Sequence, residues 1–205
     1  NKLLKFSTAV GLDLGTIDDM LTVFDRAKLN TDDIPLFIEN AKKQKPSNSV
    51  HAARDFFGYE LLLLATECLP GTKTINTNHP TVILQPDELR FAFLERTPRH
   101  AQHPIHNELR RAIGRERREN LIRQLETYEM HHYMSRSALE NYLLSGRNNT
   151  ETQLRVEHLV NIRDFISTYP GFRCWLTETD TGFNCLLKHS VEKGDSGRVF
   201  FYTHD

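Results

Sequence analysis

The chain has 205 residues, of which 39% are hydrophobic and 26% are charged. A chain of this length can bury a substantial core without disulfides or metal ions, and its composition excludes a fibrous or wholly disordered protein. The 26 Lys and Arg residues against 27 Asp and Glu residues leave a formal net charge of -1. The chain therefore lacks the overall positive charge that would hold a nucleic acid by itself.

The first fifty residues contain two amphipathic helical patterns and then a polar stretch. The first helix is expected over residues 14–29, and the second follows a cap at Asn30 or Thr31. The predicted inner face of the second helix consists of Ile34, Phe37, Ile38 and Ala41. The polar residues 42–49 predict a linker. We therefore expect a helical segment over residues 1–45, the end of a DNA-binding or linker region, and a main domain over residues 46–205.

The middle of the chain alternates helical patterns with turn-rich stretches. The first predicted elements are a helix at 51–59, a buried helix end or a strand at 61–65, and a stop at Pro70-Gly71. A loop at 72–80, an extended piece at 81–84 and a helix from Pro86 to about 94 are expected next. An irregular stretch at 97–106 then leads into a long polar helix from Pro104 or Ile105 to about 127. The inward residues of the long helix are expected to be Leu109, Ile113, Leu121, Ile122 and Leu125.

The last third of the chain combines short alternating stretches with two helical patterns. The predicted elements are a strand at 130–134, a helix capped by Ser135 or Ser137, a helix opened by the capping box Thr150-Glu151-Thr152-Gln153, a hairpin of 172–178 and 183–189, and a strand at 198–202. The second helix has an apparent apolar face of Leu154, Leu159, Ile162, Phe165 and Ile166. The order predicts an α+β fold, a small antiparallel or mixed sheet covered by several helices, with a short N-terminal helical segment.

No complete catalytic or metal-binding signature is present. His100, His103 and His106 recur at every third residue, but Pro104 breaks any helix that would align them, and no HExxH pattern accompanies them. The pair Asp87-Glu88 is explained more simply by a helix N-terminus than by a nuclease site. We assign no catalytic residue, no metal site and no cofactor.

The densest basic run lies in the long polar helix. Its six arginines alternate with glutamates at spacings that pair on a helix surface, which favours a solvated, ion-paired face over a DNA-contacting one. The arginines are Arg110, Arg111, Arg115, Arg117, Arg118 and Arg123.

Four residues are candidates for lining a ligand pocket between the strands and their covering helices. His132 alternates with Met130 in the strand at 130–134, and its imidazole is either a satisfied core group or a ligand contact. Trp175, the single tryptophan, faces opposite to its strand neighbours and is either core or a stacking platform beside His132 or Tyr133. The predicted ligand-binding residues are Met130, His132, Tyr133 and Trp175.

The cysteine and hydropathy patterns predict the compartment. Cys68, Cys174 and Cys185 form no CxxC pair, which fits a reducing cytoplasm, although a bridge between Cys174 and Cys185 stays open if their strands form a hairpin. The sequence has no signal-peptide pattern, and its longest apolar run, 61–65, is too short to cross a bilayer. We expect a cytoplasmic protein. Because the chain begins at Asn1 rather than Met, we also expect a fragment of a longer protein.

Two groups of residues resemble bacterial helix-turn-helix regulators of the XRE type that carry a C-terminal effector domain. Residues 9–14, 18–21 and 28–30 are similar to the stretch where the DNA-binding helices of such a regulator run into the linker. A second group of residues is similar to the effector domain of such regulators. It consists of Leu69-Pro70-Gly71, Ser137-Ala138-Leu139-Glu140, Gly146, Thr152-Gln153-Leu154, His158-Leu159 and Gly171-Phe172-Arg173-Cys174-Trp175-Leu176.

The resemblance implies a non-enzymatic domain that senses a signal or holds a homodimer together. A small-molecule or protein effector would bind here, and DNA would be bound by helices outside this chain. Two other classes remain open from the residues. One is a metal-dependent or nucleic-acid-processing enzyme that uses the His100–His106 loop or Asp87-Glu88. The other is a pure protein-interaction module with a large apolar patch.

Overall fold

A computed structural model describes residues 30–43, 63–77, 79–89, 104–179, 184–189, 191 and 197–202. The predicted helices at 14–29 and 51–59 and the predicted boundary near residue 45 lie outside these ranges. The described residues divide into two compact units. The first holds 30–43, 63–69 and 104–119, and the second holds the remainder from Pro70 onward.

The first unit begins with the second of the two predicted N-terminal helices. Asn30 caps the short 3-10 helix η2 (Thr31–Asp33), which continues into α3 (Ile34–Lys43). The Asn30 side chain accepts a hydrogen bond from the Asp32 amide, and the Asp33 carboxylate accepts one from the Asn30 amide, so both ends of a capping box are present. The predicted inner face is confirmed, because Ile34, Phe37, Ile38 and Ala41 are all buried.

The rest of the first unit is the apolar run near residue 63 and the first part of α7 (Pro104–Leu125). Residues 63–67 are helical and Leu63, Leu64 and Ala65 are buried, so the alternative of a buried helix end is confirmed over the strand. Glu67 and Arg117 form a two-pronged ion pair inside this unit, with both N···O distances at 2.9 Å. This pairing is the geometry in which a guanidinium and a carboxylate satisfy each other without water.

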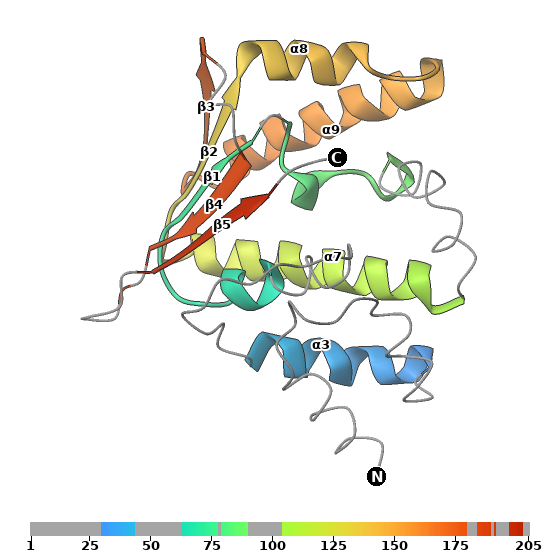
Figure 1. Cartoon of the computed structure of the whole chain (residues 1–205), viewed down its shortest axis with the longest axis vertical. Coiled ribbons are helices and arrows are strands. Elements are labelled where there is room, and N and C mark those ends of the chain that lie inside the picture. Colours follow the sequence, from blue (N-terminus) through green and yellow to red (C-terminus); the bar gives the residue numbers. More distant parts are fainter. Residues whose placement is uncertain are drawn as a thin grey trace. The chain divides into compact units, whose positions relative to one another are not determined.

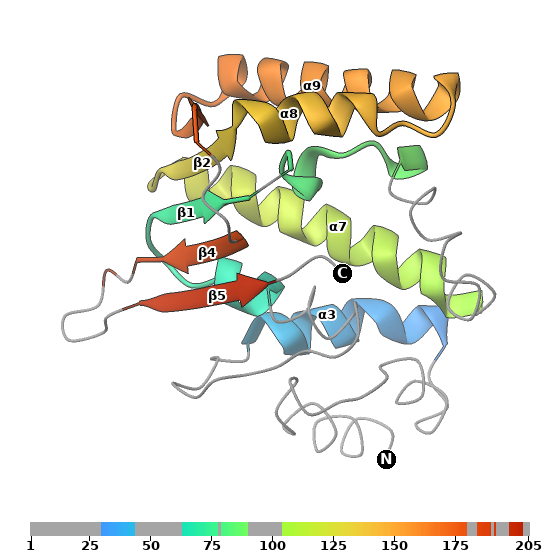
Figure 2. The same ribbon diagram turned by 45° about the horizontal axis from the view of Figure 1, so that its top comes forward.

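The second unit is built on a five-stranded mixed sheet, drawn in Figures 1 and 2. Its strands are β1 (Lys73–Asn76), β2 (Met130–Ser135), β3 (Phe172–Thr177), β4 (Asn184–Lys188) and β5 (Arg198–Tyr202), in the spatial order β3-β2-β1-β4-β5. β2 pairs in parallel with both β1 and β3, whereas β4 pairs antiparallel with both β1 and β5. The predicted α+β class with a mixed sheet is confirmed.

Two local predictions near β1 are wrong. Residues 72–80 were expected to form a loop, yet Lys73–Asn76 is the central strand and pairs on both edges. Its sequence, Lys-Thr-Ile-Asn, holds one apolar residue, so the strand is made by its neighbours rather than by its own propensity. The extended piece expected at 81–84 is a 3-10 helix, η3 (Val82–Leu84), with Ile83 and Leu84 buried.

The expected hairpin of 172–178 and 183–189 is also wrong. β3 and β4 are separated by β2 and β1 in the sheet, and β3 runs parallel to β2 instead of antiparallel to β4. Cys174 and Cys185 therefore lie on strands that are not neighbours, and both are free thiols. The turn residues between them are compatible with a hairpin, but the helices before β3 deliver that strand to the opposite edge.

Two helices cover one face of the sheet. α8 (Arg136–Leu144) is capped by Ser135, as predicted, and α9 (Asn149–Thr168) is capped by Asn148, whose side chain accepts from the Glu151 amide. The capping box expected at Thr150 is therefore wrong by two residues. Figures 1 and 2 show both helices on the same side of the strands.

The sheet has two faces of different character. We call the face against α8 and α9 the closed face, and its buried residues include Ile75, Met130, Phe172 and Leu186. The alternate residues form the open face, where the side chains of β1, β2 and β3 are only partly buried or exposed, apart from Ser135 at the end of β2, which is buried. No helix of the described residues is long and apolar enough to span a membrane.

Candidate interaction surface

The structure divides the four predicted ligand-binding residues between the two faces of the sheet. Met130 and His132 lie on the closed face and are 1% and 0% exposed. Tyr133 alternates with them and lies on the open face, where the register places it opposite Trp175 of β3. Met130 and His132 therefore lie on one face and Tyr133 and Trp175 on the other, so the four residues do not line one pocket.

His132 is held as a neutral imidazole in one tautomer. The Thr77 hydroxyl donates to the His79 carbonyl, so its oxygen accepts the hydrogen of His132 Nε2 at 3.0 Å. The other ring nitrogen, Nδ1, then accepts from the Cys174 thiol, with Sγ 3.8 Å away. Burial, with further lowering by the charges of His79, Lys73 and His158, brings the pKa of His132 to about 3.

This His–Cys contact does not form a catalytic dyad. Burial raises the pKa of Cys174 to about 12, so the thiol stays protonated at neutral pH. A nucleophilic cysteine needs the opposite shift, toward the thiolate. The alternative of a satisfied core histidine therefore fits the geometry of His132.

The aromatic pair on the open face has the opposite character. The rings of Tyr133 and Trp175 are stacked, with centroids 6.3 Å apart and planes inclined by 16°. Trp175 is 45% exposed, which is a large apolar surface for a single residue to leave in water. Tyr133 and Trp175 thus form an exposed aromatic pair on the open face, and the stacking of a ligand on Trp175 stays a prediction.

β3 adds a second apolar feature to the same place. It is an edge strand, and next to Trp175 it carries Leu176, which lies on the closed-face side but is 56% exposed. Arg173 is the only charged residue of β3, and it bonds to Glu129. The segment 174–177, Cys-Trp-Leu-Thr, has no charge, no proline and no glycine, so it lacks the devices that usually protect an edge strand from pairing. We call Tyr133, Trp175 and the outer edge of β3 the β3 surface.

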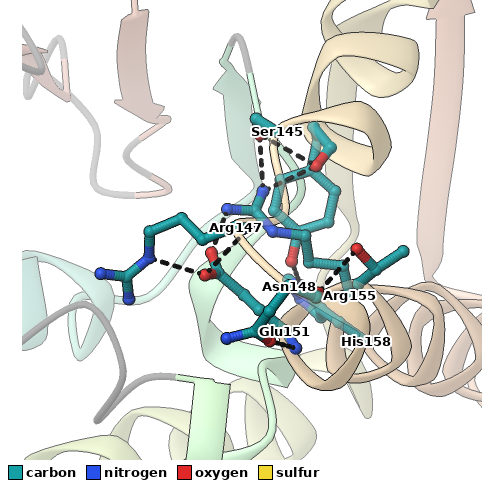
Figure 3. A network of polar contacts seen from close by, with 8 residues as sticks. Ser145, Arg147, Asn148, Glu151, Arg155 and His158 are labelled. Carbon is teal, nitrogen blue, oxygen red and sulfur yellow. Dashed lines mark hydrogen bonds and ion pairs between the residues drawn. The ribbon is translucent and has the colours of Figure 1, made fainter.

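A polar network fixes the two helices behind this surface (Figure 3). Arg155 of α9 donates to the Tyr142 carbonyl at 2.6 Å and to the Glu151 carboxylate at 2.7 Å, and Glu151 also accepts from Arg147 at 2.8 Å. His158 accepts from the Tyr142 hydroxyl at 2.7 Å and donates to the Thr81 carbonyl at 2.9 Å. The network therefore links α8, α9 and the residue before η3.

The pattern of apolar residues alone does not reveal this network. The buried face of α9 is Glu151, Arg155, His158, Ile162 and Phe165, whereas Ile166 of the predicted apolar face is exposed. The spacing of four, three, four and three residues is that of one helical face. This spacing predicts the buried face from the sequence if polar residues are accepted on the inner side of the helix.

The remaining candidates are only partly described. His100 and His103 lie outside the described residues, and within the described ones no group of three His, Cys, Asp or Glu side chains could hold a metal ion. His131 and His132 point to opposite faces of the sheet. Asp87 and Glu88 lie at the start of a helical stretch that opens at residue 87, as expected for a helix N-terminus.

The arginine run is less uniform than expected. Arg111 forms the expected surface pair with Glu108 at 2.8 Å. Arg110 and Arg117, in contrast, are buried, and Arg117 holds Glu67. Glu116 bonds to Lys42 rather than to an arginine of its own helix. The exposed members of the run are Arg111, Arg115, Arg118 and Arg123.

Comparison of the chain with protein-family models, with curated proteins and with solved structures gave no match.

Proposed function

We propose that this chain is the non-enzymatic dimerisation and partner-docking domain of a cytoplasmic bacterial transcriptional regulator. The observation that carries this proposal is the β3 surface, an uncharged strand edge flanked by the exposed Trp175 and Leu176. Surfaces of this kind mark protein interaction sites, because exposed apolar area and unpaired strand edges both favour association. The regulator context comes from the resemblance to XRE-type effector domains.

The rest of the second unit supports docking better than small-molecule capture. Met130 and His132, the closed-face candidates, are fully packed, and the polar groups of His132 already have partners. The open-face candidates, Tyr133 and Trp175, lie on the surface. In this proposal the effector is another protein chain, and it binds to the β3 surface.

Coupling to DNA would follow from the arrangement of two copies. A dimer fixes the distance between the DNA-binding helices attached to each copy, and that distance must match the spacing of two half-sites. A change in dimer affinity can shift DNA binding only by the difference in free energy between the two arrangements. The balanced charge of this chain agrees with DNA being bound elsewhere in the regulator.

Sedimentation analysis of the 205-residue chain over a wide range of concentration tests the dimer. We expect a reversible dimer that Trp175→Ala weakens by at least tenfold in Kd. The matched control is Val156→Ala, which trims another exposed apolar residue on α9 and should leave Kd unchanged. A chain that stays monomeric at every concentration would contradict the proposed dimerisation.

DNA binding tests the regulator context. The longest natural form of the polypeptide should bind DNA with a steep dependence on salt, while the 205-residue chain should not. If neither binds, the regulator assignment is wrong and the β3 surface belongs to an interaction module of another kind.

A further inference from the structure

We propose that β3 pairs antiparallel with β3 of a second copy of this chain, around a two-fold axis at Trp175, so that one sheet runs through both copies. The pairing presupposes that the chain forms dimers, as proposed above, and it specifies which strand and which register make the contact. β3 lies at the edge of the sheet, beyond β2 (Figure 1).

The direction of the backbone groups shows what the outer edge offers. The Met130 amide donates to the Gly171 carbonyl at 2.8 Å, and Met130 is in register with Phe172. In a parallel ladder this means that the odd-numbered residues of β3 direct their N–H and C=O groups toward β2. The even-numbered residues, Cys174 and Leu176, direct theirs away from the sheet.

These outward groups have no backbone partner in the part of the chain that the structure describes. The backbone N–H and C=O of Phe172 also point away from β2. The N–H already donates to the Tyr169 carbonyl at 2.9 Å, so Phe172 offers only its C=O to a second strand. The free edge therefore consists of two complete donor–acceptor residues, Cys174 and Leu176, with Trp175 between them.

Only one two-fold register uses this edge fully. An axis at Trp175 places Cys174 opposite Leu176 of the second copy, and each such pair exchanges both hydrogen bonds. An axis at Cys174 would place Leu176 opposite Phe172, whose N–H is already used. An axis at Arg173 would put two arginines opposite each other, and an axis at Leu176 would need Glu178, which lies beyond the end of β3.

The charges at the two ends of the strand are complementary in this arrangement. The basic Arg173 is the second residue of β3, and the acidic Glu178 follows the last residue of the strand. Both side chains are well exposed, each in a surface ion pair with Glu129 and Arg136 respectively. Antiparallel pairing brings the basic end of each copy beside the acidic end of the other. The uncharged residues 174–176 of the two copies then lie opposite one another, and Thr177 of each copy lies opposite Arg173 of the other.

The side chains on the open face agree with the same register. Trp175 lies opposite Trp175 of the second copy as a non-hydrogen-bonded pair, the closer of the two kinds of antiparallel pair. Because each Trp175 already stacks on Tyr133, the two copies would form a continuous row of four aromatic rings. Aromatic cross-strand pairs of this kind stabilise sheets.

Disulfide trapping reads out the register directly. In Trp175→Cys the two new thiols meet across the axis, with Cα atoms about 4.5 Å apart, a separation that a disulfide bridges. We expect rapid cross-linking of this variant on mild oxidation, identified by peptide mapping so that it is distinguished from links through the native cysteines. Arg173→Cys is the matched control, since it should link to Thr177→Cys in a mixture but not to itself.

A proline scan tests the use of the backbone. Leu176→Pro removes an outward N–H without disturbing the ladder to β2, because edge positions accept proline. We expect it to weaken the dimer at least tenfold more than Leu176→Ala, which removes the same side chain but keeps the N–H. Circular dichroism of both variants establishes that they are folded.

The outcomes separate the two proposals. A monomeric wild-type chain overturns both the dimer and its register. A wild-type dimer in which Trp175→Cys does not cross-link, or in which Leu176→Pro behaves like Leu176→Ala, overturns the β3 pairing and leaves the dimerisation function standing. Cross-linking through Arg173→Cys alone overturns the axis at Trp175.

Discussion

His132 ties the stability of the second unit to pH. Its pKa is about 3 in the folded chain against an ordinary value of 6.5, so between these values the unfolded chain binds more protons at this site. The contribution of His132 to stability is therefore independent of pH well above 6.5 and falls as pH drops below 6.5, by up to about 1.4 kcal/mol per pH unit. Burial also lowers the pKa of His79, which acts in the same direction.

His132→Gln should remove this dependence. Comparing urea unfolding at pH 7 and pH 5, we expect wild type to lose about 2 kcal/mol more than the variant does. His131→Gln is the control, because it removes the neighbouring imidazole from the open face instead of the core. Equal losses in wild type and His132→Gln would contradict the buried, neutral histidine.

Arg155 shows how a single charged residue secures two helices. Arg155→Met would leave the buried Glu151 carboxylate with Arg147, whose side chain is half exposed, and would remove the bond to the Tyr142 carbonyl. We expect a loss of about 3 kcal/mol in the free energy of unfolding. Arg163→Met, which breaks the exposed pair with Asp164, should cost less than about 0.5 kcal/mol. Similar losses in the two variants would show that the network contributes little.

The start of α9 could lie at either of two capping residues. Both Asn148 and Thr150 are acceptable caps by residue type, but only Asn148 bonds to the Glu151 amide in the structure. Asn148→Ala should destabilise the chain by about 1 kcal/mol, whereas Thr150→Ala should change stability by less than about 0.5 kcal/mol. Thermal unfolding of the two variants distinguishes them, and a larger effect at Thr150 would restore the start predicted from the capping box.

The elements also show what sequence patterns can reveal. The inner face of α3, the cap at Ser135 and the strand beginning at Met130 were predictable, because each depends on residues close in the sequence. The start of α9 was ambiguous, since two capping residues lie two positions apart. Its polar inner face was hidden, because Arg155 and Glu151 are buried only as partners of each other.

The order of the strands in the sheet is the least predictable property of the fold. Whether β3 joins β4 or β2 depends on where α8 and α9 deliver the chain, and no local signal around Thr179 and Gly182 encodes that choice. The same difficulty affects the candidate site. Trp175 could be singled out from the sequence, but its exposure depends on β3 being an edge strand.

The central position of β1 has a consequence for how the chain acquires its fold. β1 pairs with β2 on one side and with β4 on the other, and Lys73 is in register with Lys188, more than half the chain away. During synthesis, β1 leaves the ribosome long before β4 is made, so one edge of β1 stays unpaired during that time. Pairings of such large sequence separation form slowly, and an unpaired strand edge favours mispairing. Ribosome-stalled chains ending before residue 184 should therefore be more sensitive to protease around β1 than chains that include β4.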